Sequence, residues 1–124
     1  MTVNDLLNLD IEFCEKVSKL GATAWANQFM NEGVMLIKLG DNIMGEVAIY
    51  ERMKPFFQQK GASLLWSPEQ GGLSEAGDLG YTYGKYILQY KDEMGKKITE
   101  TGRYMTIWRR QPNGHYKIEV DMGN

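Results

Sequence analysis

The stretch from residue 77 to residue 124, GDLGYTYGKYILQYKDEMGKKITETGRYMTIWRRQPNGHYKIEVDMGN, decides the fold of this chain. It contains three strand-like runs, at residues 81–90, 98–110 and 115–122. The charged loop 91–97 reverses the chain between the first two. QPNG at 111–114 reverses it again, because proline presets φ and Asn-Gly accepts positive φ. The stretch therefore predicts a twisted antiparallel sheet.

The residues before this sheet are expected to be mainly helical. Residues 5–20 carry an apolar stripe at spacings of three and four, with Asn4 as the expected N-cap and Gly21 as the stop. The stripe consists of Leu6, Leu9, Phe13, Val17 and Leu20. A second short helix is expected to contain Trp25 and Phe29 and to end at Gly33.

Two further segments separate these helices from the sheet. Residues 34–40 predict a short strand, and residues 43–59 predict a helix. Pro55 should bend or break this helix, because proline lacks an N–H and crowds the preceding turn. From Ala62 an apolar and polar alternation predicts a strand whose irregular middle is bulged or lies at an edge. Residues 77–80 predict a turn.

Helices first and strands afterwards indicate an α+β fold, with N-terminal helices packed across one face of a strongly curved antiparallel sheet. Such a cone-shaped roll leaves an internal pocket where the helices and the sheet diverge. The chain has 124 residues, so we expect a single domain over residues 1–124 with a core of its own.

Composition excludes several classes of function. The net charge of −2 gives no reason to expect a nucleic acid or an anionic membrane as partner. Cys14 is the only cysteine and is expected to be a small buried residue; His115 is the only histidine, so we expect no metal site. No G-x-G-x-x-G motif occurs, and we expect no cofactor.

The sequence also bears on localisation. No apolar run reaches the length of about 20 residues that a membrane helix needs. The start, MTVNDLLNLD, lacks a basic segment followed by an apolar one, so a cytoplasmic location is expected, although a leader removed earlier would leave the same sequence.

Both faces of the predicted sheet carry apolar side chains. In the strand at 81–90, Tyr81, Tyr83 and Ile87 fall on one side, and Tyr86, Leu88 and Tyr90 fall on the other. A sheet covered on one face only should alternate apolar and polar residues, so this pattern predicts a homodimer that forms through the second sheet face. The alternative is that these tyrosines are exposed, with solvated hydroxyl groups.

Four segments carry a resemblance to a known group of proteins: GVMLIKLGDNIMGEVAI at 33–49, SEAGDLGYTYGKY at 74–86, TGRYMTIWRR at 101–110 and PNGHYKIEVDMGN at 112–124. In these segments the chain resembles the nuclear-transport-factor-2-like superfamily, on its SnoaL-like and ketosteroid-isomerase-like side, and within it a bacterial group of undefined function. The resemblance implies a cystatin-like cone with an internal pocket and a homodimer. It implies little about chemistry, because this fold carries many functions.

The catalytic groups of ketosteroid isomerases are not matched. Their aspartate base corresponds to Ile37 or Lys38, and Asp41 falls a few residues later, nearer the start of the next helix. Their tyrosine donor corresponds to Phe13, and their protonated aspartate falls near Thr106. These three departures argue against steroid-type isomerisation.

SnoaL-type cyclases instead use a carboxylate deep in the sheet, for which Glu119 and Asp121 are the candidates. Two residues apart, they share one face of a strand, and a carboxylate in an apolar cavity can act as a general acid or base. Periodicity alone would solvate both and bury the alternating apolar residues; the family geometry would turn both into the cavity. The alternating apolar residues are Tyr116, Ile118, Val120 and Met122.

The leading hypothesis is a homodimer that binds a small, largely apolar molecule in the pocket. Tyr83, Tyr104 and Trp108 would form walls, and Trp66 would lie at the rim, although ordinary packing also explains a tryptophan there. The alternatives are an isomerase or cyclase that uses Asp121 or Glu119 as acid or base, and a non-catalytic dimerisation or adaptor module. Arg103, Arg109 and Arg110 could bind a carboxylated ligand, but the expected use is a solvated strand edge or a cross-strand partner for Glu119.

Overall fold

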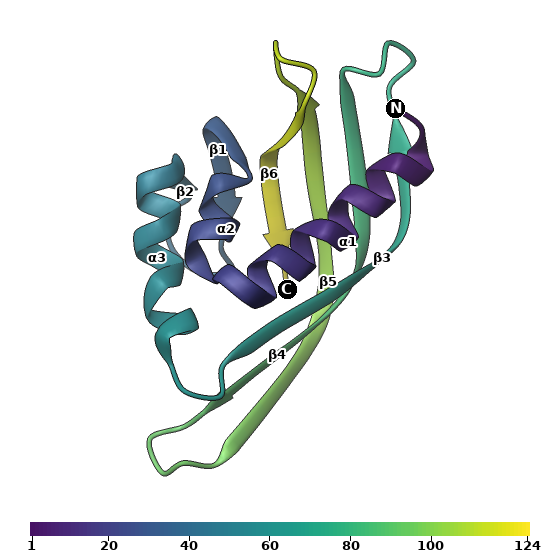
Figure 1. Cartoon of the computed structure of the whole chain (residues 1–124). Coiled ribbons are helices and arrows are strands. Elements are labelled where there is room, and N and C mark those ends of the chain that lie inside the picture. The colour runs from purple at the N-terminus through teal and green to yellow at the C-terminus, as the bar shows by residue number, and fades with distance from the viewer.

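The computed structural model describes all residues from 1 to 124 and contains three helices and six strands (Figure 1). The elements are α1 (Val3–Leu20), α2 (Ala22–Asn27), β1 (Phe29–Leu36), β2 (Ile43–Met44), α3 (Glu46–Gln58), β3 (Ser63–Leu73), β4 (Leu79–Lys91), β5 (Lys97–Arg110) and β6 (Tyr116–Gly123). The predicted α+β fold is confirmed.

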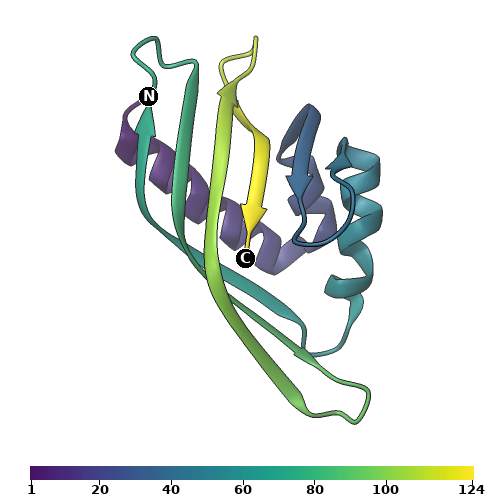
Figure 2. The same ribbon diagram turned by 180° about the vertical axis from the view of Figure 1, so that it is seen from behind.

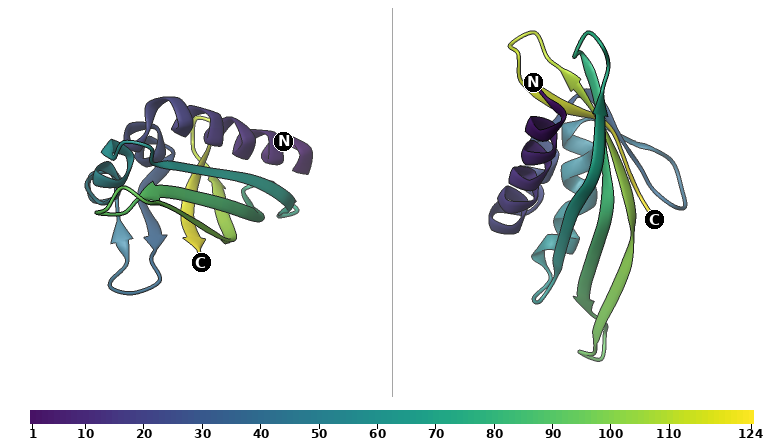
Figure 3. Two further views of the ribbon diagram at one scale, coloured as in Figure 1. Left: turned by 90° about the horizontal axis from the view of Figure 1, so that it is seen from below. Right: turned by 90° about the vertical axis from the view of Figure 1, so that its right-hand side faces the viewer.

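The strands form one open sheet with the order β2-β1-β6-β5-β4-β3. The long strands β3 to β6 pair antiparallel, as expected. Strand β1 pairs parallel with β6, so the complete sheet is mixed. All three helices lie on one face of this curved sheet, whereas the opposite face has no helix in front of it (Figures 2 and 3). We call these the inner and outer faces.

Helix α1 begins earlier than the expected N-cap. Thr2, rather than Asn4, is the cap: its side chain accepts from the backbone N–H of Asp5, and the Asp5 side chain accepts from the N–H of Thr2. This reciprocal pair satisfies two free donors at the helix start. Gly21 ends the helix as predicted, with a φ of 64°. No helix is long and apolar enough to cross a membrane.

The expected second helix is shorter, and the following strand starts earlier. Helix α2 ends at Asn27, and Phe29 already belongs to β1, where it lies opposite Ile118. The backbone N–H of Ile118 donates to the carbonyl of Gln28 at 2.9 Å, so pairing with β6 takes the chain out of the helix at this point. Helix α3 continues through Pro55, which lies in its last turn, and is therefore not broken there.

The core lies between α1, α2 and the inner face of the sheet. Its fully buried members include Leu6 and Val17 of α1 together with Trp108 and Ile118 of the sheet. Phe13 joins them through aromatic contacts with Trp25, Trp66 and Trp108, with ring centroids 5.0 to 6.1 Å apart. Cys14 is buried, as expected.

Candidate functional site

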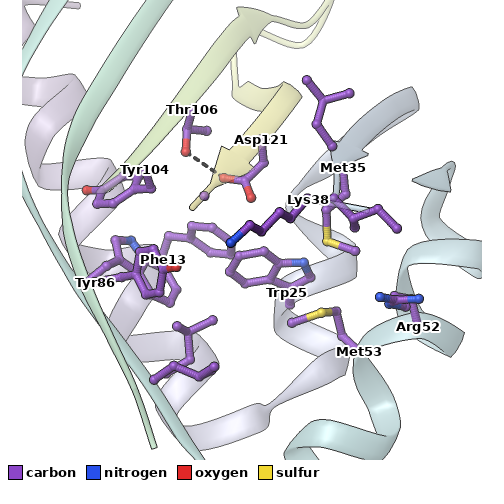
Figure 4. A pocket seen from close by; sticks show the side chains of 16 residues that line it. Phe13, Trp25, Met35, Lys38, Arg52, Met53, Tyr86, Tyr104, Thr106 and Asp121 are labelled. Atoms are coloured by element: carbon purple, nitrogen blue, oxygen red, sulfur yellow. Dashed lines mark hydrogen bonds between the residues drawn. The ribbon is translucent and has the colours of Figure 1, made fainter. Parts of the chain in front are cut away.

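A pocket of about 320 Å³ opens where α1, α2 and α3 diverge from the inner face of the sheet (Figure 4). Its walls are mostly apolar and aromatic, with Lys38 and Arg52 as exposed residues among them. The lining residues are Phe13, Trp25, Met35, Leu36, Ile37, Lys38, Arg52, Met53, Leu64, Trp66, Tyr86, Leu88, Tyr104, Thr106, Asp121 and Gly123. A concave apolar site with few polar groups is typical of small-molecule pockets.

A β-bulge in β6 decides which carboxylate faces this pocket. Trp108 of β5 lies opposite Ile118, but the preceding Ile107 lies opposite Val120, so Glu119 is the extra residue. One additional residue shifts the alternation of side chains by one position. The side chains of Ile118, before the bulge, and of Asp121, after it, therefore both point to the inner face.

Asp121 is the carboxyl group of the pocket. Thr106, directly opposite on β5, donates its hydroxyl to Oδ1 of Asp121 at 2.9 Å (Figure 4). Burial raises the pKa of Asp121 to about 7, while the Thr106 hydrogen bond lowers it and the charge of Asp10 raises it further. The side chain keeps partial contact with solvent. Asp121 can thus donate or accept a proton near neutral pH.

A second carboxylate, Asp10, lies behind the pocket wall and is fully buried. It accepts from Nε1 of Trp66 at 2.8 Å and from the hydroxyl of Tyr104 at 2.7 Å. Burial raises the pKa of Asp10, and the bonds from Tyr104 and Trp66 oppose that shift. Burial also raises the pKa of Tyr104, with a further increase from Asp10. Asp10 therefore fixes the orientation of two aromatic walls of the pocket.

The structure brings only some of the predicted site residues together. Asp121, Trp66 and Tyr104 line the pocket. Trp108 is fully buried in the core beneath it, where its indole N–H donates to the hydroxyl of Thr82 at 3.0 Å. Tyr83 lies on the outer face, stacked on Tyr81 with ring centroids 6.3 Å apart.

Glu119 is also outside the pocket. Its carboxylate accepts from Nε of Arg109 at 2.6 Å, on the outer face of the sheet. Of the expected uses of the three arginines, the cross-strand partner for Glu119 is confirmed for Arg109, and this bond raises the pKa of the Arg109 guanidinium. The sequence predicts that Glu119 and Asp121 share one face of the strand. They point to opposite faces instead, because Glu119 is the extra residue of the bulge.

Sequence reasoning missed Asp10 and the position of Trp25 in the pocket wall. The signal for Asp10 was present: it lies four residues after Leu6 and three before Phe13, on the same helix face as both. A carboxylate within an apolar stripe indicates a buried polar group. No comparable signal in the sequence distinguishes Trp25 from the other tryptophans.

The arrangement of helices and sheet recurs in solved bacterial proteins. An NTF2-like protein with a cystatin-like fold from Novosphingobium aromaticivorans matches 97% of this chain and 79% of its own, with a TM-score of 0.76 and 13% identity. The chain has the NTF2-like fold. No family model matches its sequence, and no curated protein matches it.

Two further structures of this fold have other descriptions. A ketosteroid isomerase-like protein from Erwinia carotovora atroseptica aligns over 92% of this chain and 88% of its own, with a TM-score of 0.77 and 10% identity. Aln2 from a Streptomyces species aligns over 98% and 88%, with a TM-score of 0.76 and 12% identity. The predicted resemblance is confirmed for the NTF2-like fold, which by itself does not specify a function.

Proposed function

We propose that this protein binds a small, largely apolar molecule in the pocket between the helices and the inner face. The supporting observation is the composition of the walls: most are aromatic or aliphatic, Thr106 and Asp121 form an oriented polar pair, and the two cations, Lys38 and Arg52, are exposed. Transfer of an apolar ligand from water into such walls is favourable, at about 25 cal/mol per Å² of buried apolar surface. The polar pair would orient the ligand.

The neutral dye N-phenyl-1-naphthylamine tests this proposal. We expect saturable binding of one dye per chain, measured by the rise in its fluorescence. Leu88→Trp should abolish the binding, because Leu88 lines the pocket and a larger ring there fills it. Gln89→Trp is the matched control, since Gln89 is the next residue of β4 and faces the other side. Equal loss in both variants, or no saturable binding to the wild type, would reject the pocket.

Acid–base catalysis by Asp121 is a second candidate function. The specific observation is a carboxyl group with a pKa of about 7 in an apolar pocket, where it can take a proton from a bound molecule and return it. Catalysed exchange of the α-protons of 1-tetralone with deuterated water, followed by NMR at pH 7, is the expected activity. Asp121→Asn should abolish it while the protein stays folded; exchange that persists in this variant would exclude the role.

The outer face supports the further proposal that two copies of the chain associate through it. Large apolar side chains remain exposed there, and no helix covers them (Figure 2). The most exposed are Leu65 (49%), Tyr81 (44%), Ile87 (44%), Met122 (42%) and Met105 (39%). They lie on β3, β4, β5 and β6, so burying them against a second copy would remove their apolar surface from water.

Sedimentation at micromolar concentration should therefore give about twice the chain mass of 14.2 kDa. Met105→Lys should shift the protein to monomer, because it places a charge within the exposed apolar surface of β5. Met94→Lys is the control, since Met94 is 93% exposed in the loop between β4 and β5. A wild type that sediments as a monomer would contradict the association.

A cytoplasmic location stays a prediction from the sequence.

A further inference from the structure

The three tryptophans of the chain differ in what their indole N–H groups contact. The N–H of Trp66 donates to Asp10 at 2.8 Å, and that of Trp108 donates to Thr82 at 3.0 Å. The N–H of Trp25 is buried and has no hydrogen-bond partner. It is the only buried side-chain nitrogen or oxygen in the chain with that property.

An unpartnered buried N–H is costly, because it has lost its bond to water and gained none in return. Buried polar groups in folded proteins almost always have partners, and each exception needs a physical explanation. The position of Trp25 supplies one, because this residue, 6% exposed, lines the pocket for which we propose a ligand.

We propose that the indole N–H of Trp25 donates a hydrogen bond to a neutral acceptor oxygen, such as a ketone carbonyl, of the molecule that this pocket binds. This inference rests on the proposed function and specifies its ligand class: a small apolar molecule with a carbonyl oxygen at the end that reaches α2. A neutral acceptor is favoured over a carboxylate, because Trp25 is buried and an anion bound beside it would lose its hydration. Asp121 and Asp10 would also repel an anion, whereas Lys38 and Arg52, the two cations that line the pocket, are exposed to solvent.

The two polar features of the pocket come from different elements. Asp121 and Thr106 lie on β6 and β5, whereas Trp25 lies on α2, with its ring in the wall below the carboxyl group in the view of Figure 4. A ligand can therefore contact the sheet carboxyl with one group and the indole with another. Apolar residues such as Phe13 and Leu88 would hold the rest of the molecule.

Two methionine side chains line the pocket on the side of the Trp25 indole nitrogen. In Figure 4 the indole nitrogen of Trp25 points toward the side of the pocket where Met35 and Met53 lie. Methionine is unbranched and changes conformation at low cost. Met53 is only partly buried, so its side chain can move when a ligand enters the pocket.

Nuclear magnetic resonance of the indole groups tests the proposal directly. The ¹⁵N-labelled protein should give three indole N–H signals, and the signal missing from Trp25→Phe belongs to Trp25. The probes are 1-tetralone and its hydrocarbon counterpart tetralin. We expect 1-tetralone to move the Trp25 proton signal downfield while the Trp66 and Trp108 signals stay near their positions, and tetralin to give no downfield movement.

Affinities of the same two probes complete the test. We expect 1-tetralone to bind about tenfold more tightly than tetralin, which corresponds to one hydrogen bond. Trp25→Phe should remove that difference and leave the affinity for tetralin nearly unchanged. Equal binding of both probes to the wild type, without the downfield movement, would overturn the role of Trp25 but leave an apolar pocket intact. Binding of neither probe would reject the proposed function and this inference with it.

Discussion

Replacing Asp10 by alanine is expected to lower the free energy of unfolding by about 2 to 4 kcal/mol, since two buried donors would lose their acceptor. Those donors are the indole N–H of Trp66 and the hydroxyl of Tyr104, at 2.8 and 2.7 Å. Relief from burying a carboxylate offsets part of this loss, because burial disfavours the charged form of Asp10. Urea denaturation at pH 7 measures the difference.

The matched control for this experiment is Glu12→Ala. Glu12 lies two residues further along α1 and is exposed, so its replacement should change the free energy of unfolding by no more than about 0.5 kcal/mol. Equal stabilities of the Asp10→Ala protein and the wild type would contradict the network, since they would mean that Trp66 and Tyr104 find other acceptors at no cost.

Replacing Asp10 should also change the shape of the pocket, because Trp66 and Tyr104 form part of its walls. Their side chains bridge α1 to β3 and to β5, so the carboxylate connects a helix to two strands. Without it, the walls can rotate, and dye binding should weaken more than in Glu12→Ala. This coupling joins the stability of the fold to the shape of the site.

Local sequence patterns predicted the elements better than they predicted the site. The apolar stripe of residues 5–20 and the turn at 111–114 depend on spacing and on turn chemistry, which operate within a few residues. The local pattern places Phe29 in a helix, because its pairing with Ile118 depends on a residue 89 positions away. The end of α2 is therefore set by tertiary contacts that the local sequence does not contain.

The inward face of β6 shows why the site was harder to predict. The sequence allows two registers of this strand, one that solvates both Glu119 and Asp121 and one that turns both into the cavity. The bulge at Glu119 makes each register correct for part of the strand: Tyr116 and Ile118 face the core, and Asp121 faces the pocket. Residue types alone do not fix a bulge, because its position depends on how β5 pairs with β6.

Asp121→Asn is expected to stabilise the protein at pH 8 by about 1 to 3 kcal/mol and to have little effect at pH 4. The pKa of Asp121 is raised from 3.8 to about 7, so the folded protein holds a proton that the unfolded chain releases. Stability from this group is therefore complete below pH 4 and is lost as the pH rises to about 7. Partial contact of Asp121 with solvent reduces the effect below that of full burial.

Asparagine keeps the acceptor for the Thr106 hydroxyl but has no charge to bury, so the variant should lack this decline in stability with pH. Asp78→Asn is the control: the hydroxyl of Ser74 donates to Asp78 and lowers its pKa below 3.8, so the stability lost in this variant should stay nearly constant from pH 4 to pH 8 and shrink only below pH 4. Urea denaturation from pH 4 to pH 8 compares the three proteins. Parallel curves for the wild type and Asp121→Asn would mean that Asp121 titrates as in an unfolded chain, and the acid–base role would lose its physical basis.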